Sequence, residues 1–161
     1  MPATPGPKLM TFLTFRSQAE EALEFYTALF DNSEVHRMIR ARAGEPGWEE
    51  GVLQHAVFTL DGQMFMCTNM PPPGAVGYDL APWDSYEFSP ATAIYVQCES
   101  ESEFDRLYTA LSEKGEVIMP AGGYEFSARF GWLTDRFGVS WRINLVPARG
   151  ARARRAAGAA G

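Results

Sequence analysis

Residues 135–145 read DRFGVSWRINL, and this stretch decides the fold. Its DRFG segment has the acidic residue and the glycine of a tight turn, and the apolar run that follows predicts a strand. Neighbouring side chains of a strand point to opposite faces of its sheet. We therefore predict that Trp141 faces a packed core and that Arg142 faces a cleft.

Length and composition indicate one globular domain. The chain has 161 residues, of which 46% are hydrophobic and 13% aromatic, enough to bury a substantial core. Its net charge is −6, and because residues 148–161 hold four arginines and no acid, the rest carries about −10. This acidic body disfavours nucleic-acid binding. Because the N-terminus lacks signal-peptide character and no apolar run is long enough to span a bilayer, we expect a cytoplasmic protein without membrane association.

The chain repeats one order of elements, β-α-β-β-β, in its two halves. In the first half the strand patterns cover 9–15, 34–42 and a hairpin over 51–69 with an Asp-Gly turn, and a helix over 18–30 follows Ser17 as the N-cap. In the second half the strands cover 91–98, 116–120, 127–135 and 138–146, and a helix over 100–115 opens with a Ser-x-x-Glu capping box and ends at Gly115. We expect an α+β fold in which the paired modules form a curved open sheet with a cleft, the helices covering its other face.

Four segments carry a resemblance to a known superfamily: AEEALEFYTALF (19–30), LDGQMFMCTN (60–69), FSPATAIYVQC (88–98) and DRFGVSWRIN (135–144). In this order they resemble the vicinal oxygen chelate superfamily of glyoxalase, bleomycin-resistance and dioxygenase proteins. They resemble most its PhnB-like branch, also called 3-demethylubiquinone-9 3-methyltransferase-like. The resemblance implies the paired-module fold. The expected domain therefore spans 8–147, with module one at 8–70, a linker loop at 71–90 and module two at 91–147, between a flexible N-terminus (1–7) and a disordered tail (148–161).

Strand alternation divides the side chains into two faces. If Asp61 and Gly62 form a two-residue turn, Val57 lies opposite Met66 and His55 lies opposite Thr68. The side chains on the other face of these strands are uniformly apolar and are expected to face the helices. On the cleft side we predict ligand-binding contacts from seven residues: Phe12, Thr14, His55, Met66, Thr68, Tyr95 and Arg142.

The superfamily resemblance also predicts whether the chain can bind a metal ion, from the residues at the ligand positions. Metal-using members hold the ion with His, Gln or Glu from the first and fourth strands of each module, and the corresponding places here resemble Met10, Met66, Ala91 and Arg142. Alanine and arginine do not coordinate metals in proteins, and a thioether suits Cu(I) rather than Zn, Ni, Fe or Mn. We therefore expect no metal. The sequence also contains no motif for a dinucleotide or S-adenosylmethionine, so we expect no cofactor.

Each candidate residue also has a structural interpretation. Arg142 either anchors a carboxylate, phosphate, phenolate or enolate, or it pairs with an acid such as Glu125 or sits in a dimer interface. His55 is either a hydrogen-bonding or basic group of the site or a structural histidine, whereas His36 is expected to be exposed and inert. Cys67 and Cys98 are expected to be reduced core thiols.

A loop rich in aromatic residues joins the modules. It is interpreted either as a lid over the cleft or as a plug at a junction or dimer contact, through Tyr78, Trp83, Tyr86 and Phe88. The arginine-rich tail is expected to be solvated.

The residues favour a metal-independent, homodimeric protein that binds a small aromatic or anionic molecule in the sheet cleft. The alternative is an enzyme, either a metal-dependent lyase or dioxygenase-like catalyst, or the methyltransferase that the branch name implies. Nothing in the sequence identifies the ligand.

Overall fold

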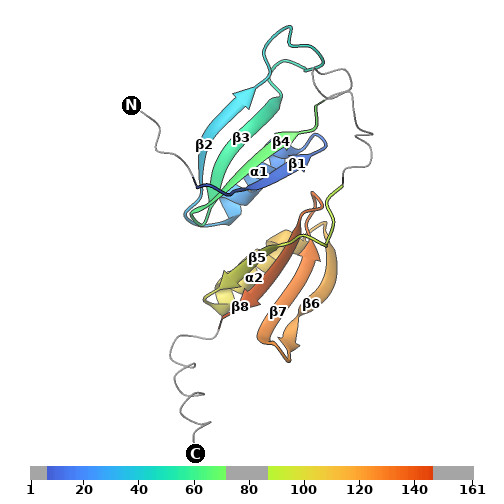
Figure 1. Ribbon diagram of the computed structural model, residues 1–161. Helices are drawn as coiled ribbons and strands as arrows, with labels where there is room; N and C mark the ends of the chain where they lie inside the picture. Colours follow the sequence, from blue (N-terminus) through green and yellow to red (C-terminus); the bar gives the residue numbers. More distant parts are fainter. Residues whose placement is uncertain (1–6, 72–86, 147–161) are drawn as a thin grey trace, which may run out of the picture. The chain divides into compact units, whose positions relative to one another are not determined.

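The computed structural model describes residues 7–71 and 87–146. The chain divides into two compact units, Met1–Tyr86 and Glu87–Gly161, and the boundary falls within the predicted linker 71–90. Each unit holds one copy of the predicted β-α-β-β-β repeat (Figure 1). Within the described residues, no helix has the length and hydropathy that crossing a bilayer requires.

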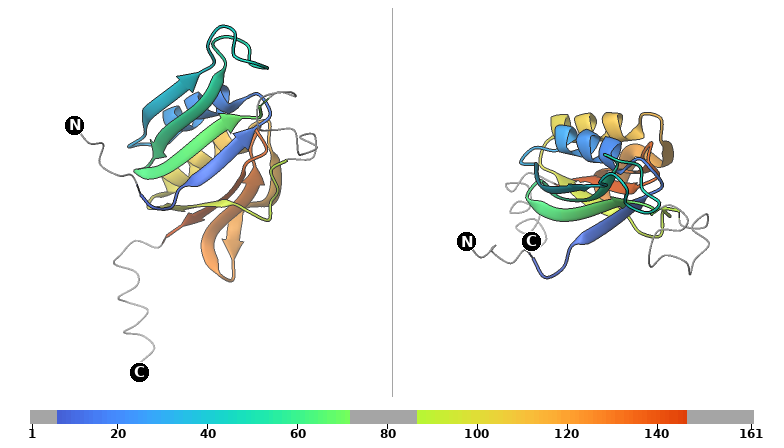
Figure 2. Two further views of the ribbon diagram at one scale, coloured as in Figure 1. Left: turned by 45° about the horizontal axis from the view of Figure 1, so that its top comes forward. Right: turned by 90° about the horizontal axis from the view of Figure 1, so that it is seen from above.

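Unit 1 is a four-stranded mixed sheet with one helix packed on it. The strand order is β1-β4-β3-β2, with β1 parallel to β4 and the other neighbours antiparallel. Helix α1 packs on β3 and β4 and covers one face of the sheet (Figure 2). The elements are β1 (Thr11–Phe15), α1 (Ala19–Leu29), β2 (Glu34–Arg40), β3 (Leu53–Leu60) and β4 (Gln63–Asn69).

Unit 2 repeats this topology. Its strand order is β5-β8-β7-β6, with β5 parallel to β8, and α2 packs on one face of the sheet. The elements are β5 (Ile94–Cys98), α2 (Glu101–Ser112), β6 (Glu116–Tyr124), β7 (Ser127–Thr134) and β8 (Ser140–Leu145). The predicted α+β class and the repeated module are confirmed.

The Asp-Gly turn sets the register of the first hairpin as predicted. Asp61 and Gly62 both have positive φ, 47° and 75°, which a two-residue hairpin turn of this kind requires. Val57 lies opposite Met66, and the β3–β4 ladder ends one position short of the predicted pair of His55 with Thr68.

The DRFG stretch is held by one buried carboxylate. Asp135, only 4% exposed, accepts hydrogen bonds at Oδ1 from the backbone amides of Phe137 (2.9 Å) and Val139 (3.1 Å). Its Oδ2 accepts a bond from the indole Nε1 of Trp141 at 2.7 Å. Gly138 has a φ of 88°, a conformation that glycine adopts without strain. Trp141 is 1% exposed, so its predicted core position is confirmed.

The helix-facing sides of the two sheets are apolar and buried, as strand alternation predicted. In unit 1 the buried strand residues include Ala56, Phe58, Leu60, Phe65 and Cys67, and they lie on the face covered by α1. In unit 2, Leu133, Trp141 and Ile143 are the corresponding buried residues under α2.

The predicted N-cap of the first helix is wrong. The N-cap residue is Gln18, not Ser17, and its side chain makes no capping hydrogen bond. The buried Asn69 at the end of β4 takes that role, because its Oδ1 accepts a bond from the amide of Ala19 at 2.8 Å while its Nδ2 donates to the Leu53 carbonyl at 2.9 Å. A residue fifty positions away caps this helix, so the local sequence does not show it.

The second helix begins as predicted. Ser100 is the N-cap and accepts a hydrogen bond from the amide of Glu103 at 3.2 Å, whereas the Glu103 carboxylate reaches the amide of Glu99 at 2.8 Å. At the other end, Lys114 and not Gly115 has the positive φ. Gly115 is needed instead for close approach, since a Cβ there would lie 2.1 Å from the Thr134 carbonyl oxygen.

Candidate functional site

In each unit, the face of the sheet opposite the helix is called here the open face. On the open face of unit 2, cross-strand pairing aligns one residue from each strand into a single row. This central row of unit 2 consists of Met119 on β6, Trp132 on β7, Arg142 on β8 and Tyr95 on β5. The arginine therefore stands between two aromatic residues.

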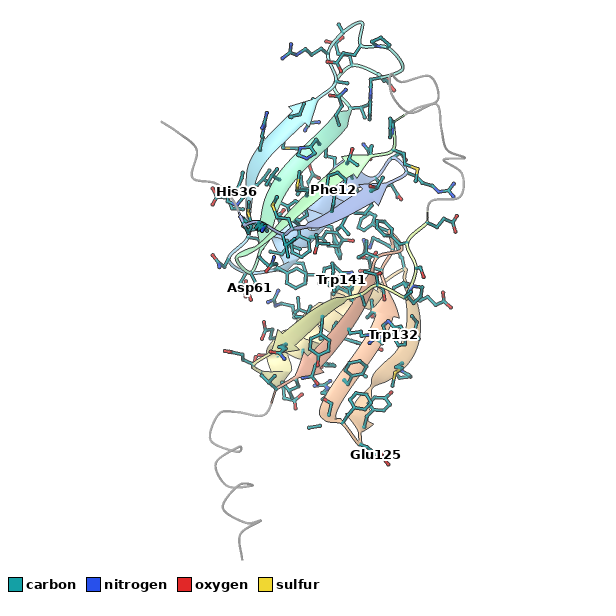
Figure 3. The ribbon with its side chains drawn as sticks, in the orientation of Figure 1. Phe12, His36, Asp61, Glu125, Trp132 and Trp141 are labelled. Carbon is teal, nitrogen blue, oxygen red and sulfur yellow. The ribbon has the colours of Figure 1, made fainter. Side chains whose placement is uncertain are left out.

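Arg142 stacks on an aromatic ring, and no acid among the described residues pairs with it. Its Cζ lies 4.2 Å from the centroid of the Trp132 ring, and Nε1 of that ring donates a 2.9 Å hydrogen bond to Ser140 Oγ, which holds the indole in place. The guanidinium Nε is buried without a hydrogen-bond partner, and Arg142 forms no ion pair with any residue in 7–71 or 87–146. Glu125 lies at the tip of the β6–β7 hairpin (Figure 3), so the pairing considered for it is wrong.

Further aromatic side chains lie on the open face of unit 2. Tyr95 is 52% exposed and is the neighbour of Arg142 across the parallel β5–β8 ladder. Further along the same face, Phe126 is 68% exposed and its ring meets that of Phe130 edge-on at 5.1 Å, while Tyr124 stacks on Phe126 at 5.6 Å. Phe126, Phe130 and Tyr124 are not among the contacts predicted from the sequence.

The open face of unit 1 carries five of the seven predicted contacts. Its central row consists of Arg37 on β2, Val57 on β3, Met66 on β4 and Phe12 on β1. The Phe12 ring is 50% exposed and its centroid lies 6.0 Å from that of the His55 ring. Phe12, labelled in Figure 3, therefore leans along the sheet toward His55.

His55 is a neutral polar group at neutral pH. Burial lowers its pKa below the usual 6.5, and the nearby positive charge of Arg37 lowers the pKa further. Its Nδ1 is buried and has no hydrogen-bond partner. A buried polar atom without a partner is uncommon and destabilises a structural site, which favours a functional interpretation of this histidine.

The two predicted threonines differ in what they offer a ligand. Thr68 pairs with Thr14 across the β1–β4 ladder, and both are partly exposed. The Thr68 hydroxyl shares its proton between the backbone carbonyls of Gln54 and Asn69, the latter at 2.9 Å. Because a hydroxyl has one proton, Thr68 is left with lone pairs and would accept rather than donate a hydrogen bond.

Two of the four positions compared with metal ligands lie outside the strands. Met10 precedes β1 and Ala91 lies in a turn before β5, which starts at Ile94 and not at residue 91 as predicted. The ladders instead place Phe12 beside Met66 and Tyr95 beside Arg142. Among the described residues, no group of three or more His, Cys, Asp or Glu side chains is arranged to hold a metal ion.

Neither central row contains Cys67, Cys98, His36 or Phe88. Cys67 and Cys98 are buried, and burial raises the pKa of each thiol to about 12, so both stay protonated and unreactive. His36 is exposed, with Nε2 3.3 Å from Thr59 Oγ1. Phe88 is partly buried. Outside the described residues lie the arginine-rich tail and the loop residues Tyr78, Trp83 and Tyr86.

The predicted contacts thus fall into two groups, five on the open face of unit 1 and two on that of unit 2. That both groups line one cleft stays a prediction. Sequence reasoning missed Arg37, because an irregularity in β2 decides which way it points.

A family model described as 3-demethylubiquinone-9 3-methyltransferase matches residues 7–144. The chain belongs to this family. The solved structure of a PhnB protein from Bacillus cereus is 43% identical, with a TM-score of 0.76 and coverage of 87% of this chain and 100% of that chain. A Pseudomonas aeruginosa protein is 27% identical, with a TM-score of 0.70 and coverage of 87% and 98%. No curated protein matches.

More distant structures share the fold of this family. A glyoxylase/bleomycin resistance protein/dioxygenase domain from Frankia sp. is 15% identical and has a TM-score of 0.55, covering 90% of this chain and 94% of that chain. The predicted PhnB-like family is therefore confirmed, and so is the predicted glyoxalase/bleomycin-resistance fold.

Proposed function

We propose that the chain is a small-molecule-binding protein that holds a planar organic anion without a metal, on the open face of unit 2. Arg142 supplies the positive charge, and Trp132 and Tyr95 contact the flat body of the ligand. A guanidinium stacked on an aromatic ring still directs its donors outward in its own plane, where a carboxylate or enolate binds in bidentate fashion.

The unpaired guanidinium of Arg142 supports this proposal most directly. A partly buried arginine on a strand normally has an acidic partner, because burying an uncompensated charge is costly. Here an aromatic ring takes one face of the guanidinium, which contributes about 0.5–2 kcal/mol, and no acid among the described residues neutralises it. A bound anion would supply the missing charge.

Calorimetric titration with naphthoate, an aromatic carboxylate, tests the proposal. We expect saturable binding to the native chain and a loss of about ten- to hundred-fold in Arg142→Met, since a charge-assisted hydrogen bond contributes about 1.5–3 kcal/mol. Arg129→Met is the matched control, because Arg129 is a β7 arginine that lies over Phe104 of α2 and pairs with two helix acids. Equal affinity in native and Arg142→Met protein would contradict the proposed role.

Native mass spectrometry of freshly purified protein complements the titration. A retained small molecule that is lost in Arg142→Met would identify the natural ligand class. Arg142→Met is expected to melt near the native temperature, because no ion pair is removed with it; a large loss of stability with unchanged binding would instead assign Arg142 a structural role.

The family description favours methyl transfer as a second candidate function. A methyltransferase of this type must bind a methyl donor such as S-adenosylmethionine. Titration of the full chain with this cofactor decides between the two functions: a saturable heat would favour transfer, and its absence alongside naphthoate binding would favour a binding protein.

We also propose that the protein is a cytoplasmic homodimer. Sedimentation equilibrium tests the assembly, because a mass of twice 17.8 kDa is expected and a monomer mass at micromolar concentration would contradict it.

A further inference from the structure

Strand β2 contains a β-bulge that turns basic side chains onto the open face of unit 1. The register against β3 shifts between Val35 and Arg37, which leaves His36 as the extra residue. Arg37 pairs with Val57, whose side chain belongs to the open face. His36 reaches the same face, since its Nε2 lies 3.3 Å from Thr59 Oγ1.

The central row of unit 1 is therefore a strip with a positive end and an aromatic end. Arg37 stands on the edge strand β2 and Phe12 on the opposite edge strand β1, with Val57 and Met66 between them. Three strand spacings make this strip about 14 Å long. Both end residues are exposed, and within the described part of the chain Arg37 forms no ion pair.

His55 adds a polar group beside the middle of this strip. Its ring lies 6.0 Å from that of Phe12, and Arg37 is close enough to influence its charge. The acid nearest in the ladder is Glu34, which pairs with Thr59 and forms no ion pair with Arg37. The strip thus combines a fixed positive charge, an apolar floor, an aromatic end and a hydrogen-bonding imidazole.

We infer that this strip binds an elongated aromatic carboxylate, whose carboxylate contacts Arg37 and whose rings pack on Met66 and Phe12. The inference rests on unit 1 alone and does not depend on the site proposed on unit 2. In unit 2 the guanidinium stands in the middle of its row, between two aromatics, so a compact anion suffices there. In unit 1 the charge stands at the end, so a longer ligand is needed to bridge charge and aromatic ring.

Methionine methyl groups report on the two rows separately. NMR spectra of the full chain with isotope-labelled methionine methyls follow Met66 in unit 1 and Met119 in unit 2 while biphenylcarboxylate is added. We expect a saturable shift of the Met66 signal, and binding weakened about ten-fold in Arg37→Gln. Arg40→Gln is the matched control, because Arg40 lies on the same strand but bonds to Glu20 at 2.8 Å and to the Gly51 carbonyl at 3.0 Å.

Two outcomes would overturn the inference. The neutral biphenylcarboxamide shifting Met66 with equal affinity would show that no charge is recognised, and an Arg37→Gln titration identical to the native one would remove Arg37 from the site. The variant Arg142→Met separates the two proposals: it should weaken the Met119 response about ten- to hundred-fold and leave the Met66 response unchanged. If the native protein shows only one of the Met66 and Met119 responses, the missing response identifies the proposal that fails.

Discussion

Replacing Asp135 with asparagine removes a charge from the turn that positions β8, and with it Arg142. The asparagine carbonyl can still accept both backbone amide bonds that Oδ1 accepts now. Its NH2 group would then face the indole N–H of Trp141, which now donates to Oδ2 at 2.7 Å. A charge-assisted bond is lost and two buried donors meet, so we expect the free energy of unfolding to fall by about 2–4 kcal/mol.

Urea unfolding followed by far-ultraviolet circular dichroism measures this loss without relying on tryptophan emission. Asp105→Asn is the control, because Asp105 is an exposed helix acid paired with Arg129 and should change stability by about 1 kcal/mol or less. In a Trp141→Phe background the cost of Asp135→Asn should fall by about 1–2 kcal/mol, since the indole donor is gone. Equal costs in both backgrounds would refute the proposed contact.

Three further predictions test other parts of the fold. Asn69→Ala leaves two buried backbone groups without partners, so urea unfolding should show a loss of about 2–4 kcal/mol; a loss below about 1 kcal/mol would contradict the capping role. Gly115→Ala should destabilise strongly because its Cβ would meet backbone at 2.1 Å, whereas Gly122→Ala, with nothing nearer than 4.0 Å, should be nearly neutral in the same assay. His55 has a lowered pKa, so below about pH 6.5 the unfolded chain binds a proton at this residue more readily than the folded chain, and stability falls with decreasing pH. His55→Gln should flatten this pH dependence of the unfolding free energy. An unchanged slope would show that His55 does not contribute to it.

Much of the fold was predictable because the signals are local. The Asp-Gly dipeptide predicts its own hairpin register, since few residues other than glycine adopt positive φ easily. Period-two alternation then assigns each strand residue to a face, which is why the burial of Phe58 and Phe65 and the exposure of Phe12 agree with expectation.

The errors arose where a distant residue or an irregular strand decides the outcome. Ser17 has the right chemistry for a cap, but Asn69 reaches the helix from β4. Arg37 is not among the contacts predicted from the sequence, yet the bulge at His36 directs it onto the open face. No periodicity in the sequence shows where a bulge falls.

The sequence by itself determined the class of the fold, the doubled module and the position of Trp141 in the core. These follow from hydrophobic periodicity, from turn chemistry and from the stretch DRFGVSWRINL, whose turn and following strand are predicted by local sequence alone. Only the tertiary structure decided what that motif does. It brought the Asp135 carboxylate to the indole of Trp141, and the indole of Trp132 to the guanidinium of Arg142. Contacts between strands depend on register and on side-chain direction in three dimensions. The sequence therefore leaves Arg142 between a ligand-binding and a structural role, whereas the structure shows it stacked on the Trp132 ring with no acidic partner among the described residues.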